Sequence, residues 1–490
     1  MSAHHAHDIL FPALPYDMKP RSTRAAGDIQ LQQFVNSATR SKDSGRRSTC
    51  RETFGERYDD LRRYAGSIKQ QTLDHLDTHI NRYIDNAQKH GVHVHFAKDA
   101  AQANAICLEI AQSRHCHVCV KSKSMVTEET GLVPALQAAG IETVETDLGE
   151  FILQLDDDAP SHIVTPMIHK DRTAVGRAFT RELGTPYSQD PAELTKIARD
   201  HMRALFQKAD LGISGANFLI ADDGSLVLCT NEGNADLSVG LPRVHIALVG
   251  IEKLIPALSD LPIFLKLLAR SATAQPITVY TTIVKGPRQP TECGGPDEVH
   301  VVLLDNGRTG LLASDARELL RCIRCGACLN ACPVYRKVGG GHAYGAVYSG
   351  PIGAVLTPAL LGLANYADLP RASSLCGACR EACPVDIDIP GQLIRLRAKL
   401  VDQRSMPWSE RTMMKAWTWT LKTSARYRLA SRLLRWAATH MSDSVDAQGR
   451  AWLKRAPGPA SGWTVGRDLP APMPQSFREW WLREHGSHRP

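Results

Sequence analysis

The sequence of 490 residues contains no apolar run long enough to cross a membrane. A transmembrane helix needs about eighteen or more consecutive apolar residues. The longest candidate, Ile352 to Ala364, is shorter and is interrupted by Pro358. The first residues also lack the basic stretch followed by an apolar stretch that marks a secretory signal peptide. With neither feature present, we expect a cytoplasmic protein without a transmembrane segment.

Nucleotide-binding motifs are also missing. No G-x-G-x-x-G sequence opens a strand–helix–strand unit and there is no Walker sequence, so neither a dinucleotide site nor ATP hydrolysis is supported. The formal net charge is +7, and from Arg395 onward eighteen Lys/Arg face seven Asp/Glu. No nucleic-acid motif accompanies this charge, so we expect no nucleic-acid partner. A solvated helical face, an acidic partner protein and peripheral contact with an anionic membrane remain open.

Cysteine, in contrast, is abundant and unevenly placed. Seven of the thirteen cysteines lie within residues 322–383. They form two runs, Cys322-x2-Cys325-x2-Cys328-x3-Cys332-Pro333 and Cys376-x2-Cys379-x3-Cys383-Pro384. The first run has the spacing with which bacterial ferredoxins bind [4Fe–4S] clusters. Clustered cysteines in a chain of this size indicate a reducing compartment and a metal site rather than disulfides.

The ferredoxin arrangement also predicts which cysteines act together. Three closely spaced thiolates bind one cluster, and the fourth cysteine of the run binds the other cluster. This rule assigns Cys322, Cys325, Cys328 and Cys383 to the first cluster, and Cys332, Cys376 and Cys379 to the second. Structural zinc is the alternative, because C-x2-C pairs also bind zinc.

The second cluster has three cysteines in this assignment. Ser373 stands where an eighth cysteine would complete the second run. The fourth ligand is therefore open between Ser373, His342, Cys293, water and a side chain of a partner. The site would also suit [3Fe–4S], although two [4Fe–4S] clusters are the main expectation.

Composition and periodicity divide the chain into four parts. Residues 1–65 predict a polar, loosely tethered and partly helical arm, 66–305 an α/β domain, 306–400 the dicluster domain, and 401–490 a basic, tryptophan-rich helical region. In the second part, short apolar runs alternate with helical patterns, which is typical of a largely parallel sheet covered on both faces. Strands are expected at residues 93–96, 116–120, 141–144, 161–165, 218–221, 225–230, 244–249, 277–284 and 299–304.

Two polar segments follow expected strands of this domain. Lys121, Ser122, Lys123 and Ser124 precede a helix, where anions bind at the carboxyl edge of parallel sheets. Asn231, Glu232 and Asn234 follow the strand after the hairpin turn Asp223-Gly224, and Asn217 lies just before that hairpin. Glu232 is a candidate base or nucleophile. Ordinary polar turns are the alternative for both segments, which together predict an anion- or substrate-binding cleft.

Several stretches together resemble the lactate utilization protein B family, an iron–sulfur family of bacterial lactate-oxidation operons. Beside the cysteine runs, the resemblance rests on residues 120–129 (VKSKSMVTEE), 214–217 (SGAN), 230–234 (TNEGN), 244–253 (VHIALVGIEK), 298–307 (EVHVVLLDNG), 341–345 (GHAYG), 462–464 (GWT) and Trp480-Trp481. The match extends through most of the chain.

The resemblance implies a fold similar to sugar-phosphate isomerases and CoA transferases for residues 70–305, followed by a helical dicluster domain. It implies a cytoplasmic complex of this chain with two other subunits that oxidises L-lactate to pyruvate. The family shares the missing eighth cysteine and maps its two clusters onto the same seven residues. Cys116, Cys119 and Cys293 fall outside that pattern.

The leading hypothesis is an electron-transfer subunit of an L-lactate dehydrogenase complex that does not use nicotinamide, with an electron acceptor that the sequence leaves open. A CoA transferase or sugar-phosphate enzyme that uses Glu232, with accessory clusters, is the second hypothesis. A redox sensor is the third.

Overall fold

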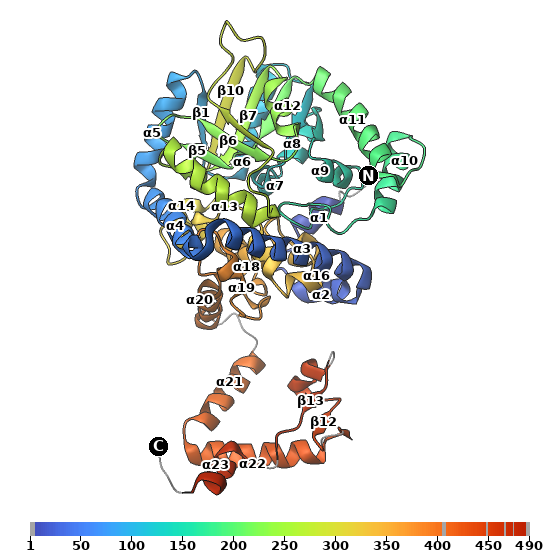
Figure 1. Ribbon diagram of the computed structural model, residues 1–490, viewed down its shortest axis with the longest axis vertical. Helices are drawn as coiled ribbons and strands as arrows, with labels where there is room; N and C mark the ends of the chain where they lie inside the picture. Colours follow the sequence, from blue (N-terminus) through green and yellow to red (C-terminus); the bar gives the residue numbers. More distant parts are fainter. Residues whose placement is uncertain (1–4, 404–407, 447–448, 465–466, 474, 487–490) are drawn as a thin grey trace. The chain divides into compact units, whose positions relative to one another are not determined.

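The computed structural model describes residues 5–403, 408–446, 449–464, 467–473 and 475–486. The chain divides into two compact units, Met1–Gln403 and Arg404–Pro490 (Figure 1). The first unit contains the α/β domain and both cysteine runs, and the second contains the tryptophan-rich region. Within the described ranges, no helix combines the length and the apolar character that a membrane span requires.

A six-stranded parallel sheet forms the centre of the first unit. Its strand order is β1-β10-β7-β4-β2-β3. The strands are β1 (His93–Ala97), β10 (Glu298–Leu304), β7 (Val244–Gly250), β4 (Leu211–Ser214), β2 (Val118–Lys121) and β3 (Glu142–Glu145). All seven residues of β7 are buried, as expected for a central strand of a parallel sheet with both faces covered. The predicted α/β class with a largely parallel sheet is confirmed.

Helices cover both faces of this sheet because its strand residues alternate between two cores. On β7, Ile246 and Leu248 pack with the helices of one face, whereas Ala247 and Val249 pack with those of the other. The first face is covered by α6 (Ala100–Ser113), α7 (Met125–Thr130) and α8 (Leu132–Ala138), and the second by α5 (Leu76–Lys89) and α12 (Asn234–Gly240).

The order of the strands reverses between β2 and β4. From β2 the chain adds β3 toward one edge, whereas from β4 it adds β7 and then β10 toward the other. Lys121, the last residue of β2, pairs with Ile213 of β4, so the two strands end next to each other. In open α/β sheets, ligands bind outside the carboxyl ends of the strands at such a switch point.

A second sheet of four strands has the order β8-β5-β6-β9. Its members are β5 (Phe218–Ile220), β6 (Leu226–Thr230), β8 (Leu254–Ile255) and β9 (Tyr280–Val284). β5 and β6 are antiparallel, and the predicted Asp223-Gly224 hairpin turn joins them. Gly224 has φ +73°, and an added Cβ would lie 2.3 Å from the backbone nitrogen of Ala87 on α5. Glycine is thus required at this turn by conformation and by close packing.

The strand expected at residues 161–165 is absent, and that prediction was wrong. His162 is buried, and its Nδ1 lies 3.0 Å from the backbone nitrogen of Val164 and 3.2 Å from that of Thr165. Because this side chain accepts the backbone N–H groups locally, they are not free to pair with a neighbouring strand.

The remaining helices of the α/β domain lie at its periphery or beside the second sheet. They are α9 (Leu148–Leu155), α10 (Arg172–Leu183), α11 (Pro191–Lys208), α13 (Leu261–Thr273) and α14 (Arg308–Leu312), with the short turns η2 (Ile251–Lys253) and η3 (Leu258–Asp260). The segment η2 follows β7 without a gap and ends at Lys253.

The N-terminal segment is packed more firmly than the sequence indicated. It forms α1 (His5–Leu10), α2 (Met18–Gly27), α3 (Ile29–Phe54), η1 (Gly55–Arg57) and α4 (Tyr58–Asp74). Val35 of α3 is fully buried in the core that contains the cysteine runs. Arg62 of α4 donates hydrogen bonds of 2.6 Å to the carbonyl oxygens of Arg380 and Cys383. The polar residues that suggested a loose arm therefore include buried contacts to the second cysteine run.

Short helices surround the cysteine runs. They are η4 (Arg317–Arg321), α15 (Ala327–Ala331), α16 (Tyr335–Val338), α17 (Gly341–Tyr344), α18 (Gly350–Leu361), η5 (Leu369–Arg371), α19 (Ala378–Ala382) and α20 (Ile389–Asp402). The helices α15 and α19 begin after Gly326 and Gly377, which have φ +75° and +83°. Both glycines belong to a Cys-Gly-Ala-Cys sequence, so the two runs share a local backbone design.

The second unit is helical but also contains a small antiparallel sheet. Its elements are α21 (Trp408–Leu421), α22 (Ser424–His440), β11 (Ser444–Val445), β12 (Ala451–Leu453), η6 (Gly458–Thr464), β13 (Leu469–Pro470) and α23 (Phe477–His485). Trp408, Trp417, Trp419 and Trp436 are exposed. The unit thus presents large aromatic side chains of the kind that protein interfaces favour.

Candidate functional site

The two cysteine runs meet in space although about fifty residues separate them along the chain. The helices α15 and α19 pack against each other, and they carry cysteines of the first and second run respectively. Cys325, Cys328, Cys332, Cys379 and Cys383 belong to one hydrophobic core and are each buried. This is the proximity that a two-cluster site built from both runs requires.

The cysteine thiols influence one another in two groups. Burial raises the pKa of Cys325, and the neighbouring Cys383 and Cys322 raise it further. Burial likewise raises the pKa of Cys383 to about 11, and Cys322 adds to the increase. Since metal binding requires thiolates, a bound cluster would offset this burial penalty.

The second group consists of Cys332, Cys376 and Cys379. Burial raises the pKa of Cys379 to about 12, and Cys332 and Cys376 add to the effect. Burial also raises the pKa of Cys332, and Cys376 adds to this increase. Cys328 is influenced by cysteines of both groups, since Cys322, Cys325, Cys379 and Cys383 all raise its pKa further after burial.

The described cysteines do not form the compact set of sulfurs that a single zinc ion binds. Thiolates bound to one zinc ion at about 2.3 Å lie about 4 Å from one another. Among the described residues, no three cysteines bring their Sγ atoms within 4.8 Å of one another.

Backbone N–H groups also point at these sulfurs. Cys322, Cys332 and Cys383 each accept a contact of 3.4 Å, from the backbone nitrogens of Arg324, Tyr335 and Ile387 respectively. Hydrogen bonds to thiolate sulfur stabilise their negative charge and tune the reduction potential of a cluster. The residues present therefore fit iron–sulfur clusters.

The candidates for the eighth ligand lie in different places. Ser373 is half-buried, and its Oγ accepts a hydrogen bond of 3.1 Å from Leu375 N. Cys376, the nearby cysteine of the second run, is exposed. Cys293 precedes β10, at the amino edge of the sheet, and is exposed. The seven residues of β10 span about 20 Å and separate it from the carboxyl edge that faces Cys325. Cys293 of the same chain is thus poorly placed to complete the second site.

His342 has other partners. Its Nε2 lies 2.6 Å from Asp158 Oδ1, and its Nδ1 lies 3.1 Å from Ser161 Oγ. His342, Asp158 and His169 form a group whose ligand atoms lie within 4.8 Å of one another. Lys170 already neutralises Asp158 at 2.7 Å, so a structural ion pair accounts for this empty group.

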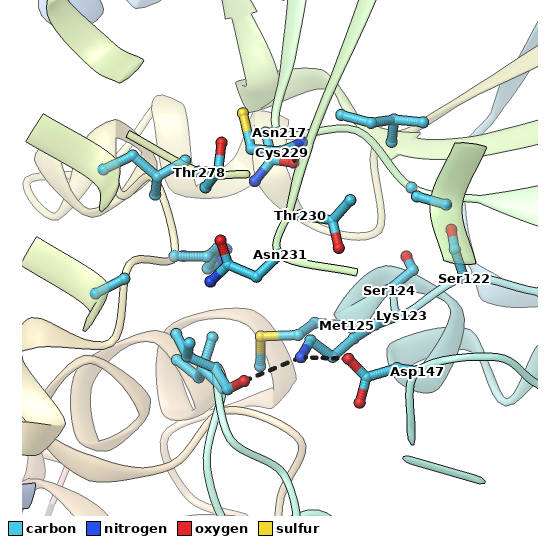
Figure 2. A pocket seen from close by; sticks show the side chains of 18 of the residues that line it. Ser122, Lys123, Ser124, Met125, Asp147, Asn217, Cys229, Thr230, Asn231 and Thr278 are labelled. Carbon is cyan, nitrogen blue, oxygen red and sulfur yellow. Dashed lines mark hydrogen bonds and ion pairs between the residues drawn. The ribbon is translucent and has the colours of Figure 1, made fainter. Parts of the chain in front are cut away.

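The predicted cleft forms a cavity of about 360 Å³ at the switch point of the sheet. Of the predicted residues, the following seven line it: Ser122, Lys123, Ser124, Asn217, Asn231, Glu232 and Asn234. Figure 2 shows the segment Ser122–Ser124 and Asp147 on one side of the pocket and Asn217, Cys229 and Thr278 on the other. The structure therefore brings the two predicted polar segments together.

Lys121 is the exception. Its side chain is fully buried and its Nζ pairs with Glu145 at 2.7 Å, while Glu150 lies at 3.8 Å. Successive side chains of a strand point to opposite faces of the sheet. Lys121, at the end of β2, therefore points away from Ser122 and into this acidic group. It does not line the cavity, and its prediction as a cleft residue is corrected. Burial raises the pKa of the nearby Glu128 to about 7.

Most polar groups of the cleft have partners within the protein. Lys123 Nζ pairs with Asp147 at 3.0 Å (Figure 2). Asn231 links Gln275 and the backbone of Val279, which gives it a structural role. Glu232 Oε2 accepts from Leu148 N at 3.3 Å, and burial together with Asp147 raises its pKa.

Two cationic residues of the cavity escaped the sequence analysis. Lys253 follows β7 and is only 7% exposed, and burial lowers its pKa to about 8, with Arg324 contributing. Arg324 stands between Cys322 and Cys325, bonds Glu252 at 3.3 Å and lies over the Tyr348 ring at 4.6 Å. The position of Lys253 directly after an apolar strand was the signal that could have identified it.

Three family models match successive parts of the chain. The LUD domain model matches residues 80–304, the 4Fe-4S dicluster domain matches 318–387, and the model named Lactate utilisation protein B, C-terminal, matches 397–486. The chain is 44% identical over 425 residues to Lactate utilization protein B of Bacillus cereus, covering 86% of this chain and 88% of the relative. It is 42% identical over 464 residues to Lactate utilization protein B of Oceanobacillus iheyensis, covering 94% and 95%.

The chain belongs to the lactate utilization protein B family. Family membership and the dicluster domain support a role in lactate utilization with iron–sulfur electron transfer. A solved DUF162 family protein from Deinococcus radiodurans is also similar, with a TM-score of 0.27 and 12% identity over 47% of this chain and 98% of that chain.

Proposed function

We propose that this protein is the electron-transfer component of a complex that oxidises L-lactate to pyruvate. The observation that supports this most is the meeting of two distant cysteine runs in one buried core. In this proposal Cys322, Cys325, Cys328 and Cys383 bind the first cluster, and Cys332, Cys376 and Cys379 bind the second.

The chemistry of lactate oxidation suits two clusters. Oxidation releases two electrons, and each bound cluster accepts one electron at a time. The residues of this chain would hold the thiolates, exclude water from the buried sulfurs, and direct backbone N–H groups at three of them. We propose two [4Fe–4S] clusters, with a fourth ligand other than cysteine at the second site.

The complex would contain two further subunits and operate in the cytoplasm. The exposed tryptophans of α21 and α22 offer a surface for such partners. The α/β cleft and the first cysteine loop share a wall, since Arg324 and Cys325 line the cavity. This proximity supports electron entry from the cleft side.

Substitution of single cysteines tests the ligand assignment. We expect Cys332→Ser to remove the second cluster and to spare most of the first, because Cys332 is grouped with Cys376 and Cys379. Iron and acid-labile sulfide analysis with electron paramagnetic resonance of anaerobic protein would measure this. Cys293→Ser is the matched control and should retain both signals. A Cys332→Ser spectrum with both signals intact would contradict the assignment, and zinc without sulfide in the wild type would end the cluster proposal.

Growth on L-lactate tests the physiological role. A strain that lacks this protein and has no redundant lactate oxidase should grow poorly on L-lactate and normally on pyruvate. Undiminished growth on L-lactate would count against the proposal. Complementation with the Cys328→Ser variant should fail, whereas the Cys293→Ser variant should restore growth.

Substitution of Glu232 tests the second hypothesis, a CoA transferase or sugar-phosphate enzyme. Glu232 lies at the cavity with a raised pKa, as a base or nucleophile of a CoA transferase or sugar-phosphate enzyme would. Under our proposal, Glu232→Gln should leave both clusters and their reduction by dithionite intact. A large loss of CoA transfer or of sugar-phosphate turnover in this variant would favour the second function instead.

A further inference from the structure

A buried lysine, Lys253, lines the cavity at the switch point. Lys253 is 7% exposed and lines the cavity, and among the described residues its Nζ has no hydrogen bond or ion pair. The adjacent Glu252 carboxylate is already engaged by Arg308 at 2.6 Å and by Arg324 at 3.3 Å. Burial of a charged group is unfavourable unless an opposite charge accompanies it. Glu252 and Cys322 attract the Lys253 ammonium without a hydrogen bond or ion pair to it, so the ammonium is available to an anionic ligand in the cavity.

Hydroxyl and amide donors line the same cavity. Ser124 is nearly buried and follows β2, whereas Asn217 follows β4 on the other side of the switch point. The two loops approach so closely that a Cβ on Gly215 would lie 2.6 Å from Ser124 Oγ. Asn217 accepts from Cys229 N through Oδ1 at 2.8 Å, which directs its amide oxygen to the protein and leaves its N–H₂ donors for a ligand.

We propose that this cavity binds a small 2-hydroxy- or 2-oxo-carboxylate, with the carboxylate paired to Lys253 and the 2-oxygen at Ser124 and Asn217. The identity of the acid rests on the proposed function, whereas the binding of a small organic anion rests on the cavity itself. Arg324 and Cys325 form part of its wall, so the ligand lies beside the first cysteine run. The site assigns substrate binding to this chain rather than to a partner subunit alone.

The charge and shape of the cavity favour a carboxylate over a phosphate ester. A phosphate dianion usually requires several converging N–H groups or cations. Here Lys123 is paired with Asp147 and Arg324 with Glu252, so among the described cations of the cavity Lys253 is the one without an ion pair, and the buried Arg324 Nη1 adds one unpaired donor. The adjoining helices α7 and α12 have six and seven residues, too short to add a strong dipole. A monoanion matches this arrangement.

Ligand binding to the full-length, cluster-loaded protein tests the inference. Isothermal titration calorimetry under anaerobic conditions would use L-lactate, pyruvate, acetate and inorganic phosphate. We expect L-lactate and pyruvate to bind, and Lys253→Met to weaken both by about tenfold or more, since it removes a charge-assisted hydrogen bond. Lys196→Met, which removes an exposed lysine of α11, is the matched control and should bind as the wild type does.

A second pair of variants separates binding from folding. Lys253→Arg retains the charge and should bind L-lactate more tightly than Lys253→Met does. Ser124→Ala should weaken L-lactate severalfold but leave acetate unchanged, because acetate has no 2-oxygen. Circular dichroism and iron content of each variant would show that the fold and the clusters are intact.

Three results would overturn the inference. They are absence of binding of either 2-substituted acid to the wild type, unchanged affinity in Lys253→Met, and tighter Lys253-dependent binding of phosphate than of the acids. Electron paramagnetic resonance of the dithionite-reduced sample distinguishes the two proposals. Intact clusters without acid binding would overturn the substrate site and leave the electron-transfer role standing. Lys253-dependent binding of the acids by a protein that cannot assemble clusters would overturn the electron-transfer role and leave the substrate site standing.

Discussion

The two cysteine sites share the sequence Cys-Gly-Ala-Cys but differ in their surroundings. The first run lies against the α/β domain, and its Arg324 has a side chain that is 8% exposed. In the second run, Arg380 has a side chain that is 56% exposed, and Cys376 is exposed as well. The local pattern sets which residues bind a cluster, whereas the tertiary surroundings set what can reach it. We propose that electrons enter at the enclosed first site and leave at the exposed second site.

The charges around the first site strengthen this contrast. Lys69 is buried and donates to the carbonyl oxygens of Glu252 and Leu254, and burial lowers its pKa to about 7. Arg308 is fully buried between Glu252 and Glu129. Such a network holds cations close to Cys322, where they would stabilise the negative charge of a thiolate-bound cluster. At the second site, Arg336 has this effect on Cys332, whereas Cys376 is exposed to solvent.

The largest effect is expected from removing one ligand at each site. In the reconstituted complex, Cys325→Ser should lower lactate-driven reduction of the chain by about a hundredfold or more, because the first cluster loses a ligand. Cys376→Ser should still show lactate-driven reduction of the first cluster, while transfer to an external acceptor falls. Rapid-freeze electron paramagnetic resonance after addition of L-lactate would measure both. If Cys376→Ser also abolished reduction of the first cluster, electrons would enter at the exposed site and the comparison would be reversed.

A smaller effect is expected from the arginine within each run. Arg324→Met leaves Glu252 with one fewer buried partner and removes the contact with Tyr348, so it should lower the free energy of unfolding by about 3 kcal/mol. Arg380→Met breaks an exposed pair with Asp388 at 3.5 Å and should cost less than about 1 kcal/mol. Denaturant unfolding of anaerobic protein would compare the two. Equal losses would mean that the first site is no more tightly integrated than the second.

The sequence was informative where function depends on spacing along the chain. The cysteine runs, the parallel sheet and the polar segments after β2 and β6 are local patterns, and strand periodicity places those segments at one edge of the sheet. The hairpin at Asp223-Gly224 was equally local, because glycine at a positive φ is dictated within the turn.

The missed features depend on contacts between distant residues. His162 replaced an expected strand because its side chain, buried against Asn330, captures the following N–H groups. Lys121 left the predicted cleft because Glu145, on a neighbouring strand, neutralises it. Lys253 became a cavity residue only because the cysteine loop with Arg324 folds over the end of β7. In each case the position in the chain gives a local hint, but the partner that decides the outcome is far away in the sequence.

The smallest effect is expected from supplying the eighth cysteine. Ser373→Cys recreates the C-x2-C spacing before Cys376. Ser373 is half-buried, and its side chain accepts a hydrogen bond from Leu375 N. The variant should raise the fraction of [4Fe–4S] at the second site and slow its loss to oxygen severalfold, while the first site is unchanged. Iron content and electron paramagnetic resonance after timed exposure to air would measure this, with Ser374→Cys as the control of shifted spacing. An identical rate of loss in wild type and Ser373→Cys would show that position 373 does not reach the second cluster. The exposed site would then owe its lability to solvent rather than to the missing thiolate.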